Sequence, residues 1–352
     1  MPFKSDIPIS EKKVHEIITH NFPNETIISI EEIKRSFVNP VYAIVLSNGQ
    51  NFILRINNPH WPDKQKRELN ALKLAQEKTS IPIPKTILFD SNQKLIPYDY
   101  MIQEKAPGLE LNTAITSEQL DEDQFERIIE QLASYLGELH SIQFDFFGDF
   151  SLKDVNPPKQ DATISDRLWG SKYANWQSCF RAFCFDNLNW VDTSSFANMR
   201  KPLIKKIDEF SKMIPQPETA CFVHSDIQPT NILVQKGKIS AILDFEWSYA
   251  GSSSFDYSLT LAGLSFDSFP SLDKSNALSN YKALTKERIE KLFLDGYRKT
   301  YKGKIYSEPE GLGDFIWLLY MIGSWNWSIK SSSKEEISVM EKNIHDLYSR
   351  YT

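Results

Sequence analysis

Short apolar runs and a longer helical period make up the first hundred residues. The runs predict five strands, at residues 26–33, 41–46, 51–56, 86–89 and 98–103. Asn48-Gly49 stands between two of these strands and is a strong signal for a tight hairpin. Helical spacing predicts a short helix over 10–20, capped by Ser10, and one over 62–78. We expect a small antiparallel β-sheet lobe with one helix beside the sheet.

The pattern becomes helical after Ala106-Pro107-Gly108, which we interpret as a turn and a candidate hinge. Apolar residues between Phe125 and Leu139 follow the period of an amphipathic helix. Helical patterns return near residues 167–190, 197–213, 286–302 and 311–330.

Two stretches interrupt this helical region. Residues 148–165 have little periodicity and predict a long loop, whereas residues 221–245 form a single β-like island. The expected fold is therefore α+β and bilobal, with an N-terminal lobe over 1–105 and a larger, mainly helical lobe over 106–352.

Composition narrows the class of protein. Hydrophobic residues make up 41% of the 352 positions, which excludes an intrinsically disordered chain. Lys and Arg number 40 against 46 Asp and Glu, and the net charge of −6 gives no general attraction to nucleic acid. The longest apolar stretch, Phe315–Trp325, is shorter than the ~18 residues that span a bilayer, and the first residues are too polar for a secretion signal. We expect a cytoplasmic enzyme that binds neither nucleic acid nor membrane.

Cysteine and glycine usage exclude two common kinds of site. The three cysteines have no CxxC spacing and are expected to be buried, reduced thiols. Only 13 glycines occur, and neither GxGxxG nor GxxxxGK[ST] is present, so a glycine-rich phosphate loop is not expected.

Polar side chains gather at the ends of the strands in the β-like island. His224, Asp226 and Asn231 follow one apolar strand with the spacing His-x-Asp-x-x-x-x-Asn, and Asp244 precedes Phe245 at the end of the next. This is the layout of a phosphotransferase catalytic loop. The Asp226 carboxylate is suited to accept or orient the proton of an attacking hydroxyl, and the side-chain oxygens of Asn231 and Asp244 are suited to bind Mg²⁺. We expect His224 to brace the loop rather than to titrate in the reaction.

The spacing alone is only moderately specific, since it arises by chance in roughly 2% of chains of this composition. The apolar residues on both sides and the second strand ending in Ile-Leu-Asp-Phe make coincidence much less expected. The alternative is an ordinary hairpin with polar ends.

A second charged pair lies upstream. Arg55 ends the third predicted strand, and Glu68 falls on the helix that follows. A strand cation paired with a helix carboxylate positions the α- and β-phosphates in kinases. The alternative is two unrelated surface charges.

These segments together resemble the aminoglycoside phosphotransferase family, which is similar to choline kinase and distantly to protein kinases. The likeness runs from about residue 27 to 266. It rests on FVHSDIQPTNILV, ILDFEWSYAGSSSFDYS, FILRI and RELNALKLA. Ser225 replaces the glycine of the family's His-Gly-Asp, and Asp256 matches an aspartate that buttresses the catalytic loop. The resemblance implies a protein-kinase-like fold.

The resemblance also implies where a nucleotide binds. DYMIQEKAPG resembles the hinge between the lobes. There Glu104 would accept from the adenine amine through its carbonyl, Ala106 would donate its N–H, and Gln103 would be the gatekeeper. Arg55 stands where protein kinases have Lys, and many relatives use Arg there.

The phosphate loop departs from the family's pattern. It reads Arg35-Ser-Phe-Val-Asn-Pro40, and Pro40 has no N–H to offer a phosphate. We expect the phosphate to be bound instead by Ser36 and Asn39, or by the backbone amides of Phe37 and Val38.

The expected activity is transfer of the γ-phosphate of ATP or GTP, with Mg²⁺, to a hydroxyl of a small molecule such as an aminoglycoside-like antibiotic. The acceptor is expected between the loop at 148–165 and the helices after 286. Acidic and aromatic candidates are both present, so aminosugar and apolar acceptors stay open. The candidates are Asp161, Asp166, Asp186, Asp267 and Asp314, with Trp169, Trp176, Trp317, Trp325 and Trp327. The unusual phosphate loop leaves a catalytically weak nucleotide-binding regulator or scaffold as an alternative, and a protein kinase is a third. Either a monomer or a homodimer is compatible with the sequence.

Overall fold

The computed structural model describes residues 7–34, 39–59, 63–151, 157–189, 196–217, 219–264, 281 and 284–351. The chain divides into two compact units. The first comprises Met1–Ile128 and Pro229–Trp247, and the second comprises Ile129–Gln228 and Ser248–Thr352. The boundary predicted between residues 105 and 106 stays a prediction.

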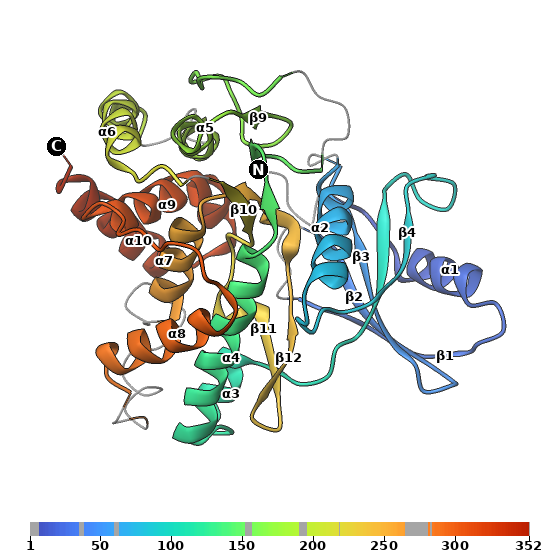
Figure 1. The fold of residues 1–352 in the computed structure, drawn as a ribbon. Coiled ribbons are helices and arrows are strands. Elements are labelled where there is room, and N and C mark those ends of the chain that lie inside the picture. The colour runs from blue at the N-terminus through green and yellow to red at the C-terminus, as the bar shows by residue number, and fades with distance from the viewer. Residues whose placement is uncertain are drawn as a thin grey trace. The chain divides into compact units, whose positions relative to one another are not determined.

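A five-stranded antiparallel sheet forms the centre of the first unit (Figure 1), in the order β1-β2-β3-β5-β4. Its strands are β1 (Ile27–Glu32), β2 (Val41–Leu46), β3 (Asn51–Ile56), β4 (Thr86–Asp90) and β5 (Tyr100–Glu104). All five lie within a few residues of their predicted positions. Gly49 takes φ +83°, as the predicted hairpin between β2 and β3 requires.

Two helices accompany this sheet. In α1 (Glu11–Asn21) the Ser10 hydroxyl accepts from Lys13 N–H as the predicted cap, and Val14 and Ile17 join the core of the sheet. The second is α2 (Lys64–Lys78), which follows β3. Both helices lie within two residues of the ranges predicted for them, 10–20 and 62–78.

A smaller sheet belongs to the same unit, in the order β12-β11-β6. Its elements and neighbouring helix are β6 (Leu109–Glu110), α3 (Leu111–Thr116), β11 (Ile232–Gln235) and β12 (Lys238–Ile242). Gly108 has φ +113°, and a Cβ there would lie 2.5 Å from the carbonyl oxygen of Val234. The predicted turn at 106–108 therefore needs glycine for both its backbone conformation and its contact with β11.

The second unit joins short strands to a set of helices. The strands, in the sheet order β7-β10-β13-β8-β9, are β7 (Gln143–Phe144), β8 (Phe147–Gly148), β9 (Lys172–Tyr173), β10 (Ala220–Val223) and β13 (Tyr249–Gly251). The helices are α5 (Trp176–Asn189), α6 (Arg200–Met213), α7 (Ser253–Leu264), α8 (Lys286–Thr300), α9 (Leu312–Ser331) and α10 (Lys334–Tyr348). Helix α4 (Glu122–His140) crosses from the first unit into the second.

An aromatic core holds the second unit together. Trp176, Phe180 and Phe183 of α5 surround Phe255 of α7, with ring centroids 5.4–5.9 Å apart. Such close, mostly tilted ring packing stabilises beyond the area that the rings bury. The three cysteines are buried and unpaired, as expected, and burial raises the pKa of each thiol.

Some elements differ from the prediction. The helix expected near 167–190 begins only at Trp176, because β9 pairs with β8 just before it. Helices α7 and α10 were not expected. Among the described residues, no helix has the length and apolar character needed to cross a bilayer.

Candidate active site

A charged cluster lies where β3, α2 and the turn after β12 meet in the first unit. Arg55 of β3 forms an ion pair with Glu68 of α2, whose side chain is only 2% exposed. The guanidinium also lies 3.9 Å from Oδ1 of Asp244. The structure thus brings together the predicted strand cation and its helix carboxylate. Their function in positioning phosphate stays a prediction.

Asp244 has a strained backbone, and its carboxylate is partly shielded from water. Its φ of +67° is unusual for a residue with a side chain. Burial raises its pKa to about 6, and the charge of Glu246 adds to the rise while Arg55 and Lys64 oppose it. Oδ1 is buried and accepts no hydrogen bond from a described residue. A buried, unsatisfied carboxylate oxygen is a natural ligand for a cation.

Asn231 lies beside Asp244 through strand pairing. Leu243 N–H donates to the Asn231 carbonyl oxygen over 2.9 Å, directly after the β11–β12 ladder ends. An amide oxygen and a carboxylate oxygen therefore come from neighbouring positions. This donor set fits Mg²⁺, which takes oxygen ligands and keeps several waters or phosphate oxygens.

A second ion pair in this unit was missed by the sequence analysis. Lys64 Nζ lies 2.5 Å from Glu246 Oε1, and both side chains are at most 10% exposed. Lys64 also sits 4.6 Å from the centre of the Trp247 ring. Lys64 precedes Glu68 by four residues, so both lie on one face of α2. That spacing was the available signal, but the partner's position depends on a long-range contact.

The predicted adenine contacts lie at the end of β5. Gln103 pairs with Ile53 and Thr86, so it occupies an interior strand. Glu104 is the last residue of β5, and Ala106 follows Lys105, whose N–H donates to the Asn51 carbonyl oxygen. These backbone groups fit the adenine contacts that the resemblance implies, which stay predictions.

The predicted phosphate loop is only partly described. Ser36, Phe37 and Val38 lie outside the described residues. Asn39 is 5% exposed, and its Oδ1 accepts from Asn58 N–H over 3.0 Å. Asn39 therefore holds the segment after β3, and its contact with phosphate stays a prediction.

The predicted catalytic loop lies in the second unit, directly after β10. His224 is fully buried, and its Nδ1 accepts from the N–H of Asp226 over 3.3 Å. Ser225 has φ +66°, so the residue in place of the family's glycine keeps a glycine-like backbone. Gln228 Nε2 donates to Asp226 Oδ1 over 3.1 Å. The contacts of His224 are those of a bracing residue.

Asp256 of α7 binds the backbone of this loop. Its carboxylate accepts from the N–H groups of His224 and Ser225, at 2.8 and 2.9 Å. Burial alone would raise the pKa of Asp256, but hydrogen bonds from His140 and from the backbone hold it below its usual value. An ionised Asp256 therefore stabilises the strained loop, as the family resemblance implies.

The candidate acceptor residues have mostly structural contacts. Trp176 and Trp325 are buried in the core, Asp161 pairs with Arg181, and Asp166 pairs with Lys159. Asp267 lies outside the described residues, as does the side chain of Trp327.

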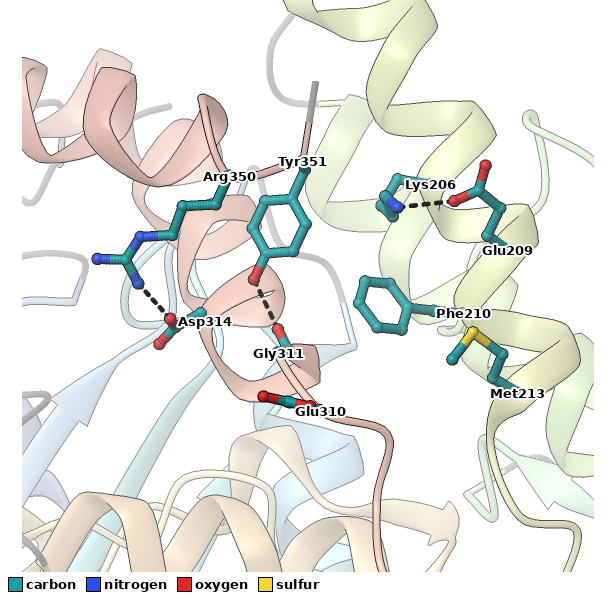
Figure 2. A pocket seen from close by; sticks show the side chains of 9 residues that line it. All are labelled: Lys206, Glu209, Phe210, Met213, Glu310, Gly311, Asp314, Arg350 and Tyr351. Atoms are coloured by element: carbon teal, nitrogen blue, oxygen red, sulfur yellow. Dashed lines mark hydrogen bonds and ion pairs between the residues drawn. The ribbon is translucent and has the colours of Figure 1, made fainter.

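A hollow of about 360 Å³ lies between α6, the start of α9 and the chain end (Figure 2). Phe210 and Tyr351 line it, as does Asp314, which pairs with Arg350 at 2.5 Å. None of the predicted catalytic or nucleotide residues lines this hollow.

The sequence profile of the phosphotransferase enzyme family, APH, matches residues 29–285. The chain belongs to this family. The match covers both the charged cluster of the first unit and the catalytic loop of the second, and it confirms the family resemblance. No curated protein matches the sequence at a significant level.

Solved structures show that this family member shares the protein-kinase-like fold of other phosphotransferases. A protein of Thermobifida fusca assigned as a fructosamine-3-kinase has a TM-score of 0.61 and 14% identity, covering 97% of this chain and 99% of that one. Aminoglycoside phosphotransferase APH(4)-Ia, in a thermostable mutant bound to ADP and hygromycin B, has a TM-score of 0.55 and 12% identity, covering 96% of this chain and 98% of that one. Macrolide 2'-phosphotransferase MphH of Brachybacterium faecium has a TM-score of 0.56 and 11% identity, covering 94% of this chain and 97% of that one. The α+β kinase-like fold is therefore confirmed.

Proposed function

We propose that this family member transfers the γ-phosphate of ATP or GTP to a hydroxyl group of a small molecule. The observation that carries the proposal is the cluster of Arg55, Glu68 and Asp244, of which Glu68 is buried and the other two are partly exposed. A cation held by one carboxylate beside a second, unsatisfied carboxylate suits a magnesium-bound polyphosphate better than it suits a purely structural core.

Each residue of the nucleotide site has a distinct part in this proposal. Arg55, oriented by Glu68, binds the α- and β-phosphates in a bidentate way. Asn231 and Asp244 hold Mg²⁺, which supplies positive charge against the phosphate oxygens when bound. The backbone of Glu104 and Ala106 holds the adenine ring.

Asp226 receives or orients the proton of the attacking hydroxyl. Its backbone N–H is fixed by His224, and its side chain by Gln228. Asn231 follows Asp226 by five residues, so the chain can separate the two by no more than about 18 Å.

The acceptor class is the open part of the proposal. The relatives with solved structures are described as acting on hygromycin B, a macrolide or a fructosamine. We propose that the acceptor is a hydroxylated small molecule similar in size to these compounds. We also propose that the protein acts in the cytoplasm as a monomer or homodimer, with no nucleic acid or membrane partner.

A coupled ADP-release screen tests the proposal. Wild-type protein with Mg²⁺ and either ATP or GTP would be offered aminoglycosides, macrolides, glycated amines, choline and homoserine. At least one acceptor should raise ADP release above the acceptor-free rate, and Asp226→Asn should abolish that increase. Nucleotide binding without any acceptor-dependent turnover would instead support the regulator or scaffold.

A further inference from the structure

We propose that Tyr297 is a positioning residue for the catalytic loop, acting through His140 and Asp256. The proposal rests on the function proposed above, since it concerns the same loop. The three side chains form a buried chain of hydrogen bonds that ends at the backbone N–H groups of His224 and Ser225.

The contacts of this chain are short and fully enclosed. The Tyr297 hydroxyl lies 2.6 Å from His140 Nδ1, and His140 Nε2 lies 3.1 Å from Asp256 Oδ2. Tyr297 and His140 are 0% exposed and Asp256 is 1% exposed. In such surroundings each broken hydrogen bond leaves a buried polar atom unsatisfied, so the arrangement is strongly specified.

The direction of the hydrogen bonds follows from the charge of Asp256. An ionised carboxylate can only accept, so His140 donates from Nε2. His140 Nδ1 then accepts, and the Tyr297 hydroxyl is its donor. Burial raises the pKa of Tyr297, so the phenol keeps its proton. The tyrosine thereby fixes both the tautomer and the ring orientation of His140.

Glycines bring Tyr297 within reach of His140. A Cβ on Gly296 of α8 would overlap the backbone of Glu130 in α4, and one on Gly137 of α4 would lie 2.9 Å from the Tyr297 carbonyl oxygen. The two helices thus touch backbone to backbone. Thr300 Oγ1 donates to the Ser134 carbonyl oxygen over 2.6 Å at the same contact. Helix α8 is therefore placed firmly enough to act on the loop.

The last hydrogen bond of this chain, from Ser225 N–H to Asp256, explains why the position of the Tyr297 hydroxyl matters. Ser225 holds a left-handed backbone, which is unfavourable for a residue with a side chain. Asp256 compensates by binding the N–H of Ser225, the residue next to Asp226. Without Tyr297 the His140 ring is free to turn, Asp256 loses a donor, and the carboxylate of Asp226 shifts from its working position.

Tyr297→Phe and the matched control Tyr301→Phe test this assignment. The Tyr301 ring also contacts His140, at 5.9 Å, but its hydroxyl bonds Ser253 Oγ at 3.0 Å. We expect Tyr297→Phe to lower kcat about tenfold with the KM for nucleotide unchanged, whereas Tyr301→Phe keeps the kcat of the wild type. Melting temperatures of both variants should fall by similar amounts. Equal kcat values for the two variants would overturn the assignment.

Long-range ¹H–¹⁵N spectra of the histidines give a readout that needs no turnover. In the wild type the Nε2 of His140 should carry the proton that Asp256 accepts, and the Nδ1 resonance of His140 should shift in Tyr297→Phe but not in Tyr301→Phe. An unchanged resonance would refute the hydrogen-bond chain. If the chain is present but no acceptor is phosphorylated by the wild type, the proposed function fails separately.

Discussion

At the scale of single residues, Asp244 shows how the site stores unfavourable energy. Its folded pKa of about 6 lies above the ordinary value of 3.8, because burial and Glu246 disfavour its charge. Ionisation therefore opposes folding. Stability linked to this group is complete below about pH 4 and is lost as the pH rises through about 6. The carboxylate carries this cost in the free protein, and under the proposed function a bound cation would relieve it.

Asp244→Asn should therefore separate stability from activity. We expect the metal-free variant to be more stable than the wild type at pH 8, on the order of 1 kcal/mol after allowance for its partial exposure, and equal to it at pH 4. Acceptor-dependent turnover should fall at least 100-fold, since a ligand of Mg²⁺ is lost. Chemical denaturation at the two pH values measures the first effect.

A saturating concentration of Mg²⁺ and nucleotide supplies the control for this experiment. The ligands should stabilise the wild type more than the variant. If Asp244→Asn is less stable than the wild type at both pH values, the carboxylate is a structural ion-pair partner and not a cation ligand.

Replacing Glu68 should have a different effect from replacing Asp244, because the Glu68 side chain is only 2% exposed and that of Asp244 is 32% exposed. Glu68→Gln leaves the Arg55 charge with only the more distant Asp244. We expect a loss of about 2 kcal/mol in stability and an increase of about tenfold in the KM for nucleotide. Glu77→Gln, on an exposed position of the same helix, should change neither. An unchanged KM in Glu68→Gln would contradict the phosphate-positioning function of Arg55.

Much of the candidate site could be predicted at this scale, because its residues are close in sequence. His224, Asp226 and Asn231 share one short loop, and strand pairing places Asp244 beside Asn231. Glu246 could not be matched to Lys64, since nothing local states that two distant segments meet. The link from Tyr297 to His140 spans 157 positions and was invisible for the same reason.

At the scale of elements, the contact between α4 and α8 transmits position to the catalytic loop. Gly296→Ala should destabilise the protein by about 2 kcal/mol, because the new Cβ meets the backbone of Glu130 and not a flexible side chain. It should also lower kcat, since Tyr297 is the next residue. Gly313→Ala is the matched helical control, with nothing within 4 Å of its Cβ, and should be neutral or slightly stabilising. A tolerant Gly296 would show that the helices can separate.

Element prediction succeeded where one face of a segment is apolar. The strands of the first sheet and helices α1, α4 and α8 follow their hydrophobic periods. Helix α7 is apolar around most of its surface, so no period marks it. Helix α10 could have been found, since Ser333 and Glu336 form a capping box at its start. The two-residue strands β6 to β9 depend on long-range pairing and leave no local pattern.

At the scale of the whole molecule, family and fold are established while the acceptor is open. The solved relatives share the fold at 11–14% identity, and they are described as acting on different acceptors. The predicted catalytic loop and the charged cluster of Arg55, Glu68 and Asp244 are built from local motifs that sequence patterns describe. The acceptor site was expected among less regular segments, which sequence patterns do not describe.

The most direct test of the account is the transfer of γ-phosphate itself, followed by ³¹P NMR with the best acceptor from the ADP-release screen. Wild-type protein with Mg²⁺ should produce ADP and a phosphate ester in equal amounts. Asp226→Asn, correctly folded, should still bind nucleotide but form ester at least 1,000-fold more slowly. Ester formation at the wild-type rate by Asp226→Asn would contradict the account.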